Sequence, residues 1–408
     1  MKIKSAVEKL TLTLVFFPFV GFLHGIDIQP TALLALAGFC FCFVRSYSYQ
    51  GVIALLISLI SMLSVSLYHG DSFTKAHAVF IASMATIFFM YSIIKSGGFL
   101  ISNRFVRNVI LVYLSIAFVQ VFVPDFLEFL ISRQNSELLI ESGRGVKSLT
   151  SEPSVFGTIL IFLNLLFIYT YTEEKNRSLE RSHLLRLIAI SLGLLVFSVM
   201  LIQSFFAFFL HLLTLSTLVF FIRKRYFLLL LFLGLLLFTF ITTLAMGGGR
   251  FFVILDLIMT NPEYLLTQGA MARVLNIPIS IIASLQNGFL GVGFDVNSAV
   301  EVSLFKGAYN VYIMDRNLGG FIEFYLKLGL ASIPLFFILF LTFYKLCSYS
   351  VMIKNRIVSI GTAAAISIGV IILNNGTMVS PIIWFTLFYF CYSTSPITTT
   401  KKGNPYEK

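Results

Sequence analysis

The sequence predicts an all-α polytopic membrane protein with about twelve transmembrane helices, and three observations carry this prediction. Of the 408 residues, 58% are hydrophobic, and the mean hydropathy is +0.93. Only 12% of the residues are charged, whereas soluble domains carry about 25%. Apolar runs of roughly 18–22 residues recur along the chain, which is the length that an α-helix needs to cross about 30 Å of hydrocarbon. The short alternating segments of an outer-membrane barrel are not seen in the sequence.

Twelve spans fit the apolar runs. We expect them at about residues 10–25, 28–44, 51–68, 74–94, 105–124, 153–172, 185–202, 205–222, 226–244, 321–343, 357–374 and 381–395. The first run has the basic start and apolar core of a signal peptide but no small-x-small cleavage site, so we expect it to remain as the first span. The chain is then a single membrane domain covering residues 1–408.

The distribution of charge predicts the orientation. Most of the 29 Lys and Arg residues, but only a minority of the 18 Asp and Glu residues, fall on the side of the membrane that holds the N-terminus. The positive-inside rule therefore places both termini in the cytoplasm, including the tail at 396–408. The net charge of +11 is explained by topology and by contact with anionic membrane lipids, and it gives no indication of nucleic-acid binding.

Two extracytoplasmic loops are much longer than the other connections. The first covers residues 125–152, and the second covers residues 245–320. The second loop contains the helix-like stretches "RFFVILDLIM" and "MARVLNIPISIIASL", separated by the breakers "NPE" and "NGFLGVGF". We therefore expect short helices in this loop, with a turn at "GVGF". Long loops are usually either functional or disordered, and the apolar content of these two argues for function.

Several kinds of chemistry are disfavoured by the sequence. It contains no P-loop, no G-x-S-x-G elbow and no His, Cys or carboxylate cluster with metal-ligand spacing. Cys40 and Cys42 fall within an apolar span without such neighbours, and the external loops contain no cysteine. We therefore expect neither a metal nor a cofactor, and no disulfide can be argued for the external loops.

The long loops do carry many charged residues. The basic ones are Arg133, Arg144, Lys147, Arg250, Arg273, Lys306 and Arg316, and the interspersed carboxylates are Glu141, Glu152, Asp256, Glu263, Asp295, Glu301, Asp315 and Glu323. The planar guanidinium of arginine binds phosphate or diphosphate through two parallel hydrogen bonds. A carboxylate acts as a general base where its surroundings tune its pKa. The simpler alternative is that these charges only solvate the loops.

Two arginines stand out from this set. Arg144 precedes Glu152 by eight residues at the mouth of the sixth span, and Arg273 interrupts the apolar stretch "GAMARVLNIPI". A charge among apolar residues tends to be desolvated and therefore to need a partner. Pro153 suits the first turn of a helix, and Glu152 just before it suits the cap, where a carboxylate complements the helix dipole. Glu152 therefore has two possible roles, as a helix cap and as a proton acceptor.

These features together resemble the bacterial O-antigen and capsule polymerases (Wzy-type) and, more loosely, the O-antigen ligases. The resemblance covers most of the chain. It consists of twelve spans, two large external loops, the arginines Arg144 and Arg273, the "TSEPS" run entering a helix, "NGFLGVGF", and "RNLGGFIEFYLKLGL" before a span. The ligases also carry a histidine–asparagine pair near the end of the second loop. Here Arg316–Asn317 stands in that place, which favours a polymerase.

The resemblance implies a metal-independent glycosyltransferase at the outer face of the bacterial plasma membrane. Its substrates would be polyprenyl (undecaprenyl) diphosphate-linked oligosaccharides, and a flippase and a chain-length regulator are possible partners. Arg144 and Arg273 match the loop arginines that such enzymes are thought to use on the diphosphate. Glu152 is our first choice for the proton acceptor, with Asp315 and Glu141 as alternatives. Arg250, Lys147, Arg316, Asp315 and Glu323 are the further candidates for substrate binding.

Other functions remain open from the sequence. An O-antigen ligase is the nearest rival, and a cell-wall transglycosylase is more distant. A lipid-linked oligosaccharide flippase would show related halves and polar residues inside the bundle, and an ion-coupled transporter would show intramembrane charges. The lone His211 in the eighth span is expected to be a packing residue, whereas His69 and His77, which flank the short outer loop "HGDSFTKAH", are expected at the membrane interface.

Overall fold

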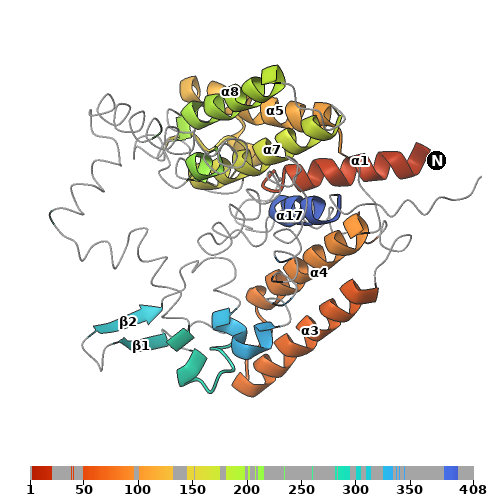
Figure 1. The fold of residues 1–408 in the computed structure, drawn as a ribbon. Helices are drawn as coiled ribbons and strands as arrows, with labels where there is room; N and C mark the ends of the chain where they lie inside the picture. The colour runs from red at the N-terminus through yellow and green to blue at the C-terminus, as the bar shows by residue number, and fades with distance from the viewer. Residues whose placement is uncertain are drawn as a thin grey trace, which may run out of the picture.

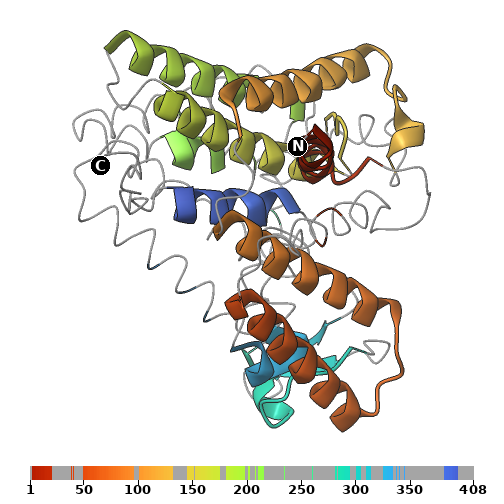
Figure 2. The same cartoon turned by 90° about the vertical axis from the view of Figure 1, so that its right-hand side faces the viewer.

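The computed structural model describes residues 2–20, 49–95, 101–131, 145–150, 152–174, 181–197, 281–294 except 283, 300–304, 309–313, 325–333 and 381–393. It also describes 201–202, 210–215 and some single positions. Within these residues the fold is helical except for one short β-hairpin. The helices form layers, with α5, α7 and α8 at one side, α1 and α17 in the middle, and α4 and α3 at the other side (Figures 1 and 2).

Most of the described helices match predicted spans. They are α3 (Tyr49–His69), α4 (Lys75–Lys95), α5 (Asn103–Phe122), α7 (Pro153–Glu174), α8 (Arg181–Phe197) and α17 (Pro381–Ser393). Of these, α3 and α5 are long and apolar enough to cross a membrane. The predicted spans at 28–44, 226–244 and 357–374 lie largely or wholly outside the described residues, and those at 205–222 and 321–343 are described only in part.

The first helix differs from its predicted bounds. Helix α1 covers Lys2–Phe16, so it begins and ends about eight residues before the predicted span at 10–25. Proline explains the early end, because the residue that precedes a proline is disfavoured in helical conformation, and Phe17 precedes Pro18. Helix α5 ends in a similar way at Phe122, where Val123 precedes Pro124 and has non-helical backbone angles.

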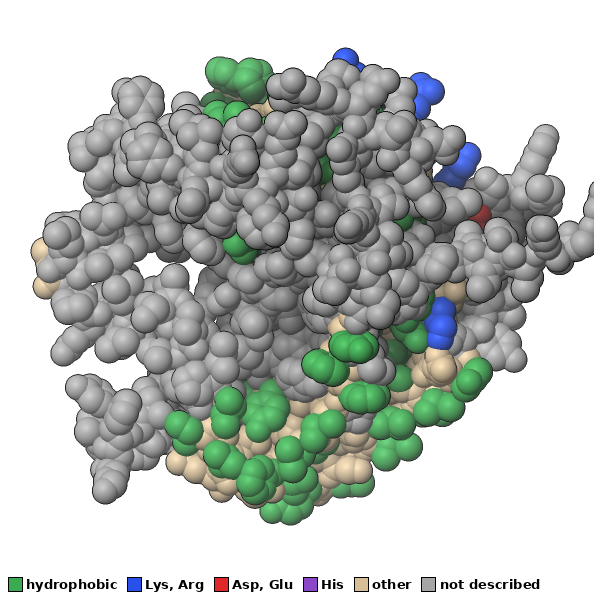
Figure 3. Space-filling view, viewed as in Figure 1, with side chains coloured by type: hydrophobic (Ala, Val, Ile, Leu, Met, Phe, Trp, Pro, Cys, Tyr) green, Lys and Arg blue, Asp and Glu red, His purple; other side chains and the backbone are tan. Residues whose placement is uncertain are grey.

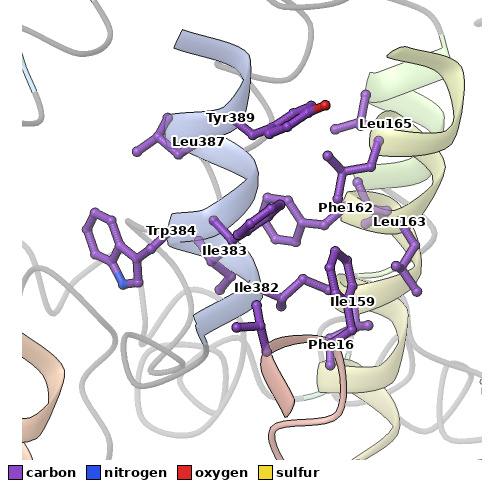
Figure 4. Close-up of a cluster of buried hydrophobic side chains, with 14 of the residues drawn as sticks. Phe16, Ile159, Phe162, Leu163, Leu165, Ile382, Ile383, Trp384, Leu387 and Tyr389 are labelled. Carbon is purple, nitrogen blue, oxygen red and sulfur yellow. The ribbon is translucent and has the colours of Figure 1, made fainter. Parts of the chain in front are cut away.

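Helix α17 is the centre of the described bundle. Nearly all of its side chains are buried, and its aromatic rings touch three neighbouring helices. Phe385 meets Phe16 of α1 at 5.5 Å between ring centroids, Phe388 meets Tyr91 of α4 at 5.5 Å, and Tyr389 meets Tyr169 of α7 at 5.7 Å. Figure 4 shows Ile382 and Tyr389 directed toward α7, with Trp384 on the opposite side of α17. A helix that is apolar all round belongs in such a position.

Helix α3 is the opposite case. Its outward stripe leaves Ile53, Leu56, Ile60, Leu63 and Leu67 between 51% and 82% exposed. These side chains form part of the apolar lower face in Figure 3. The Lys and Arg side chains visible in the same view lie toward the end at which α1 begins. A large exposed apolar face with charges gathered at one end suits a helix bordered by lipid.

The second long loop contains a feature that the sequence analysis did not predict. Strands β1 (Val300–Leu304) and β2 (Tyr309–Ile313) form an antiparallel hairpin in which Val300 pairs with Ile313 and Leu304 with Tyr309. Both segments are rich in β-branched and aromatic residues, which favour strands. The expectation of an all-α protein with short helices in this loop was therefore wrong at 300–313, where the alternation of apolar and polar residues in "VEVSL" favours a strand.

Candidate functional site

Only two of the predicted site residues lie in the described part of the chain. These are Lys147 and Glu152, both at the end of the first long loop. The remaining predicted site residues are Arg144, Arg250, Arg273, Asp315, Arg316 and Glu323, and they lie outside the described residues. The candidate site is therefore built from the segment 145–152 and its surroundings.

The segment 145–150 is buried inside the bundle although it belongs to a loop. At its start, Gly145 has a φ of +76°, and a Cβ added there would lie 2.4 Å from the carbonyl oxygen of Ile202 and 2.5 Å from that of Leu201. The next residue, Val146, donates its backbone N–H to the Leu201 carbonyl at 2.9 Å. Only glycine tolerates both this backbone conformation and such a close approach. The loop is thereby fixed against the residues that follow α8.

Gln120 in the last turns of α5 holds the middle of the segment. Its Oε1 accepts the backbone N–H of Ser148 at 2.7 Å. Its Nε2 donates to the carbonyl oxygens of Ser148 and Phe126, each at 3.1 Å. The hydroxyl of Ser148 adds a bond to the Tyr113 carbonyl at 2.7 Å. A buried backbone needs such partners, and here the side chains of one helix and one loop provide them.

Lys147 is fully enclosed, with none of its side chain exposed. Its ammonium group lies 3.5 Å from Oε1 of Glu128, whose side chain is 27% exposed. Burial lowers the pKa of Lys147, and the negative charge of Glu128 partly offsets this effect. Lys147 and Glu128 therefore form an ion pair that is largely shielded from solvent.

Asp125 extends this pair toward solvent. Its exposed carboxyl group shares a hydrogen bond with Glu128, and this bond, together with the charge of Glu128, raises the pKa of Asp125. Glu128 begins the short 3-10 helix η1 (Glu128–Leu130), which follows Leu127 in a left-handed conformation with φ of 62°. We call Gln120, Asp125, Glu128, Lys147 and Ser148 the first-loop cluster.

The sequence analysis missed the acidic half of this cluster. Asp125 and Glu128 lie in "PDFLEFL", between the fifth span and the rest of the first loop. Nothing local in the sequence connects them to Lys147, because the contact joins residues 19 positions apart. The signal in the sequence was a pair of acidic residues, three positions apart, in an otherwise apolar stretch of the loop that also contains Lys147.

Glu152 stands directly before α7, as predicted, and α7 begins at Pro153. The carbonyl oxygen of Glu152 accepts the Thr150 hydroxyl at 2.8 Å and the backbone N–H of Phe156 at 3.1 Å. The same Thr150 hydroxyl lies 2.7 Å from the Lys147 carbonyl. Glu152 is half-buried. One threonine therefore ties the backbones of Lys147 and Glu152 together, so the two residues keep a fixed relation.

A second buried polar group lies at the other side of the molecule, around the loop between α3 and α4. His77 is 2% exposed, and its Nε2 lies 2.8 Å from the Ser66 hydroxyl. Its Nδ1 accepts the backbone N–H of Thr74 at 3.1 Å. The Phe294 ring packs on the imidazole at 4.5 Å between centroids. The expectation that His77 is an interfacial side chain is wrong, because ring packing and two partnered nitrogens hold it inside; His69 is half-buried.

The "GVGF" turn completes this second group. Gly291 and Gly293 have φ of +75° and +79°, so the predicted turn is confirmed. The backbone N–H groups of Val292 and Gly293 donate to the carbonyls of Leu326 and Lys327, and that of Phe294 donates to Asp71 Oδ2 at 2.7 Å. We call Ser66, Asp71, Thr74, His77 and Phe294 the His77 corner. It joins the loop between α3 and α4 to the turn at 291–294 of the second long loop.

His211 agrees with its prediction as a packing residue. It is 2% exposed and forms a hydrogen bond with the backbone of Gly157 in α7. Among the residues that the structure describes, no group of three His, Cys, Asp or Glu side chains is arranged to hold a metal ion. In comparisons with known proteins, the sequence matches no family model and no curated protein.

Proposed function

We propose that this protein is a multi-pass glycosyltransferase of the bacterial plasma membrane that polymerises polyprenyl-diphosphate-linked oligosaccharide repeat units at the outer face. The observation that carries the proposal is the construction of the first long loop. Its end returns into the bundle as the buried segment 145–150, which follows Arg144 in the sequence and precedes Glu152 at the start of α7. A loop that only solvates the membrane surface has no need of such a construction.

The proposed reaction needs few protein groups. A hydroxyl of the acceptor sugar attacks the anomeric carbon of the donor glycan, and a new C–O bond forms. The bond between that carbon and the diphosphate oxygen breaks, and polyprenyl diphosphate leaves with the bonding electrons. The acceptor proton passes to a carboxylate. Negative charge therefore accumulates on the diphosphate oxygens, where arginine donors stabilise it most.

In this proposal Arg144 and Arg273 bind the departing diphosphate, and Glu152 accepts the proton. Arg250, Arg316, Asp315 and Glu323 contribute to binding the diphosphate and the sugars. The N-terminus of α7, the positive end of the helix dipole, lies next to Glu152. The backbone N–H groups of this first turn add to the attraction for an anion. The exposed apolar face of α3 and the long apolar helices support a location in the membrane.

The test is made in the native host with Arg144→Ala and Arg273→Ala variants. Removing one preorganised donor at such a site costs about a hundredfold or more in rate. We expect cells that carry surface glycan with a single repeat unit and little polymer, as measured by gel electrophoresis of extracted glycan. Long polymer in both variants would contradict the assignment. A failure of lipid-linked units to reach the outer face would instead identify a flippase.

The ligase alternative is tested in the same extracts. A ligase variant would leave polymer attached to polyprenyl diphosphate and none on the final acceptor, whereas a polymerase variant would still transfer single units. A Lys95→Met variant serves as a control. Lys95 is the last residue of α4, it is not part of the first-loop cluster, and its ammonium group bonds to Gln50 and Tyr91. This control should make polymer of wild-type length.

A further inference from the structure

The first-loop cluster contains a buried charge whose cost needs an explanation. The Lys147 side chain is fully enclosed, and its ionic partner, Glu128, is itself only 27% exposed. Removing a lysine from water is costly, and the attraction to nearby carboxylates repays this cost only in part. An apolar side chain of the same size would fill the position at least as well. Stability alone therefore gives a weak reason for a lysine here.

The neighbouring contacts show what the pair does fix. The backbone on both sides of Lys147 is bonded, through Val146 to Leu201 and through Ser148 to Gln120. The Lys147 carbonyl accepts the hydroxyl of Thr150, which also bonds to the carbonyl of Glu152. The ion pair connects this segment to η1, which starts at Glu128.

We propose that the Glu128–Lys147 ion pair is a positioning device that sets the buried segment 145–150 and, through the Thr150 hydroxyl, the backbone of Glu152, the proposed proton acceptor. This inference rests on the proposed function. Lys147 acts from inside the protein and does not need to touch substrate. Glu128 is a positioning residue that the sequence analysis had not singled out.

The physical reason is the sensitivity of group transfer to geometry. A displacement of about 1 Å in a reacting group costs about a hundredfold in rate. An apolar contact permits sliding, whereas an ion pair joining two irregular segments specifies one arrangement. Buried ionic and polar groups that select one arrangement at a cost in stability are known from other proteins. The carboxyl of Asp125, bonded to Glu128, continues the same connection to the surface.

The test measures polymerisation by the full-length protein in liposomes supplied with lipid-linked repeat units. The variants are Glu128→Gln, Glu128→Asp, Lys147→Met and the double variant Lys147→Met/Glu128→Gln, with Lys95→Met as a lysine control. We expect kcat per folded molecule to fall by about tenfold to a hundredfold in Glu128→Gln, Lys147→Met and the double variant. The KM for the lipid-linked donor should change by less than about threefold. Glu128→Asp should recover most of the rate, because it keeps the charge.

A purely structural role gives a different result. It would lower the amount of folded protein or its melting temperature, while kcat per folded molecule stays at the wild-type value in all variants. That result overturns the inference, as does a Glu128→Asp variant no more active than Glu128→Gln. If either single variant fails to fold because one charge is left unpaired, the double variant supplies the answer, since it removes both charges. A double variant with wild-type kcat overturns the inference.

The wild-type protein separates the two proposals. If it forms polymer and the variants match it, this inference fails and the proposed function stands. If the wild-type protein forms no polymer under the same conditions, the proposed function fails and the inference fails with it.

Discussion

The two buried polar groups of this protein, the first-loop cluster and the His77 corner, join distant segments by different chemistry. The His77 corner is held mainly by an imidazole between two partners and two phenylalanine rings. Nδ1 accepts the Thr74 N–H, and Nε2 lies beside the Ser66 hydroxyl. The first-loop cluster instead encloses a lysine and a carboxylate.

We expect the two regions to differ in what they contribute. Hydrogen bonds and ring packing stabilise the folded state. A buried ion pair contributes little net stability but fixes geometry. We therefore expect damage to the His77 corner to appear in stability, and damage to the ion pair to appear in the rate of the reaction. The predictions below compare the two regions in order of decreasing effect.

The largest effect is expected for Gly145→Ala in the first-loop segment. The alanine would be strained at φ of +76° and would lie within 2.6 Å of backbone atoms of Leu201 and Ile202. Strain and overpacking each cost about 1–3 kcal/mol. Gly70→Ala is the matched control near the His77 corner, since Gly70 has a φ of +67° but no atom within 4 Å of an added Cβ.

Gly70 lies in a Schellman motif at the end of α3, where Asp71 N–H bonds to the Ser66 carbonyl at 2.9 Å. An alanine there should cost only about 1 kcal/mol. Thermal unfolding in detergent measures both variants. Equal losses at the two glycines would show that the close backbone approach at Gly145 is relieved by movement of the loop.

The next effect is expected for Gln120→Met. The substitution removes three hydrogen bonds and leaves the buried Ser148 N–H and the carbonyls of Ser148 and Phe126 without this partner. At about 1 kcal/mol for each bond, the loss of unfolding free energy is about 3 kcal/mol. The control is Gln50→Met at the exposed start of α3. If Gln120→Met lost no more unfolding free energy than Gln50→Met, the loop would hold its position without Gln120.

A smaller effect is expected for His77→Leu. It keeps an apolar side chain against Phe294 but removes the bonds to Ser66 and Thr74, at a cost of about 2 kcal/mol. Ser66→Ala removes one of these bonds and should cost about 1 kcal/mol. The turnover of folded His77→Leu protein should equal that of the wild type. A specific fall in kcat would contradict the structural role of the corner.

The smallest effect concerns the pH dependence of the first-loop cluster. The pKa of Asp125 is raised above its ordinary value of 3.8, so the folded state holds this proton more tightly than the unfolded chain does. The hydrogen bond to Glu128 therefore contributes stability below the unfolded pKa and loses it as pH rises through the raised folded pKa.

An Asp125→Asn variant keeps a donor to Glu128 at every pH. Its melting temperature should vary less than that of the wild type on the acid side, in the interval just above pH 3.8. Thermal unfolding of both proteins at a series of pH values measures this difference in melting temperature. Identical acid profiles for the two proteins would contradict the assigned hydrogen bond.

The sequence predicted the helices better than it predicted the candidate site. Spans such as 51–68, 74–94 and 153–172 were found within a few residues of α3, α4 and α7, because long apolar runs and Pro153 give local signals. The early end of α1 was missed because hydropathy outweighed the signal of Pro18. The hairpin at 300–313 was missed because its alternating pattern is short.

The candidate site depends on contacts that no local pattern contains. The burial of Lys147 follows from Gly145 packing on Leu201 and Ile202 and from Gln120 reaching across to Ser148. The partner of Lys147 is 19 residues earlier, in a stretch that reads as ordinary loop. His77 was predicted to lie at the interface because it flanks the short loop "HGDSFTKAH", whereas in space it packs against Phe294. The sequence does point to the segment that holds Lys147 and Glu152.

Whether this protein joins lipid-linked glycans, as proposed, can be decided by analysing the products of a reconstituted preparation. Purified full-length protein in liposomes is supplied with one polyprenyl-diphosphate-linked repeat unit and no nucleotide sugar. We expect lipid-linked products of two, three and more repeat units, with one polyprenyl diphosphate released for each bond formed, as measured by mass spectrometry. Repeat units that stay single, or that only change leaflet, would contradict it.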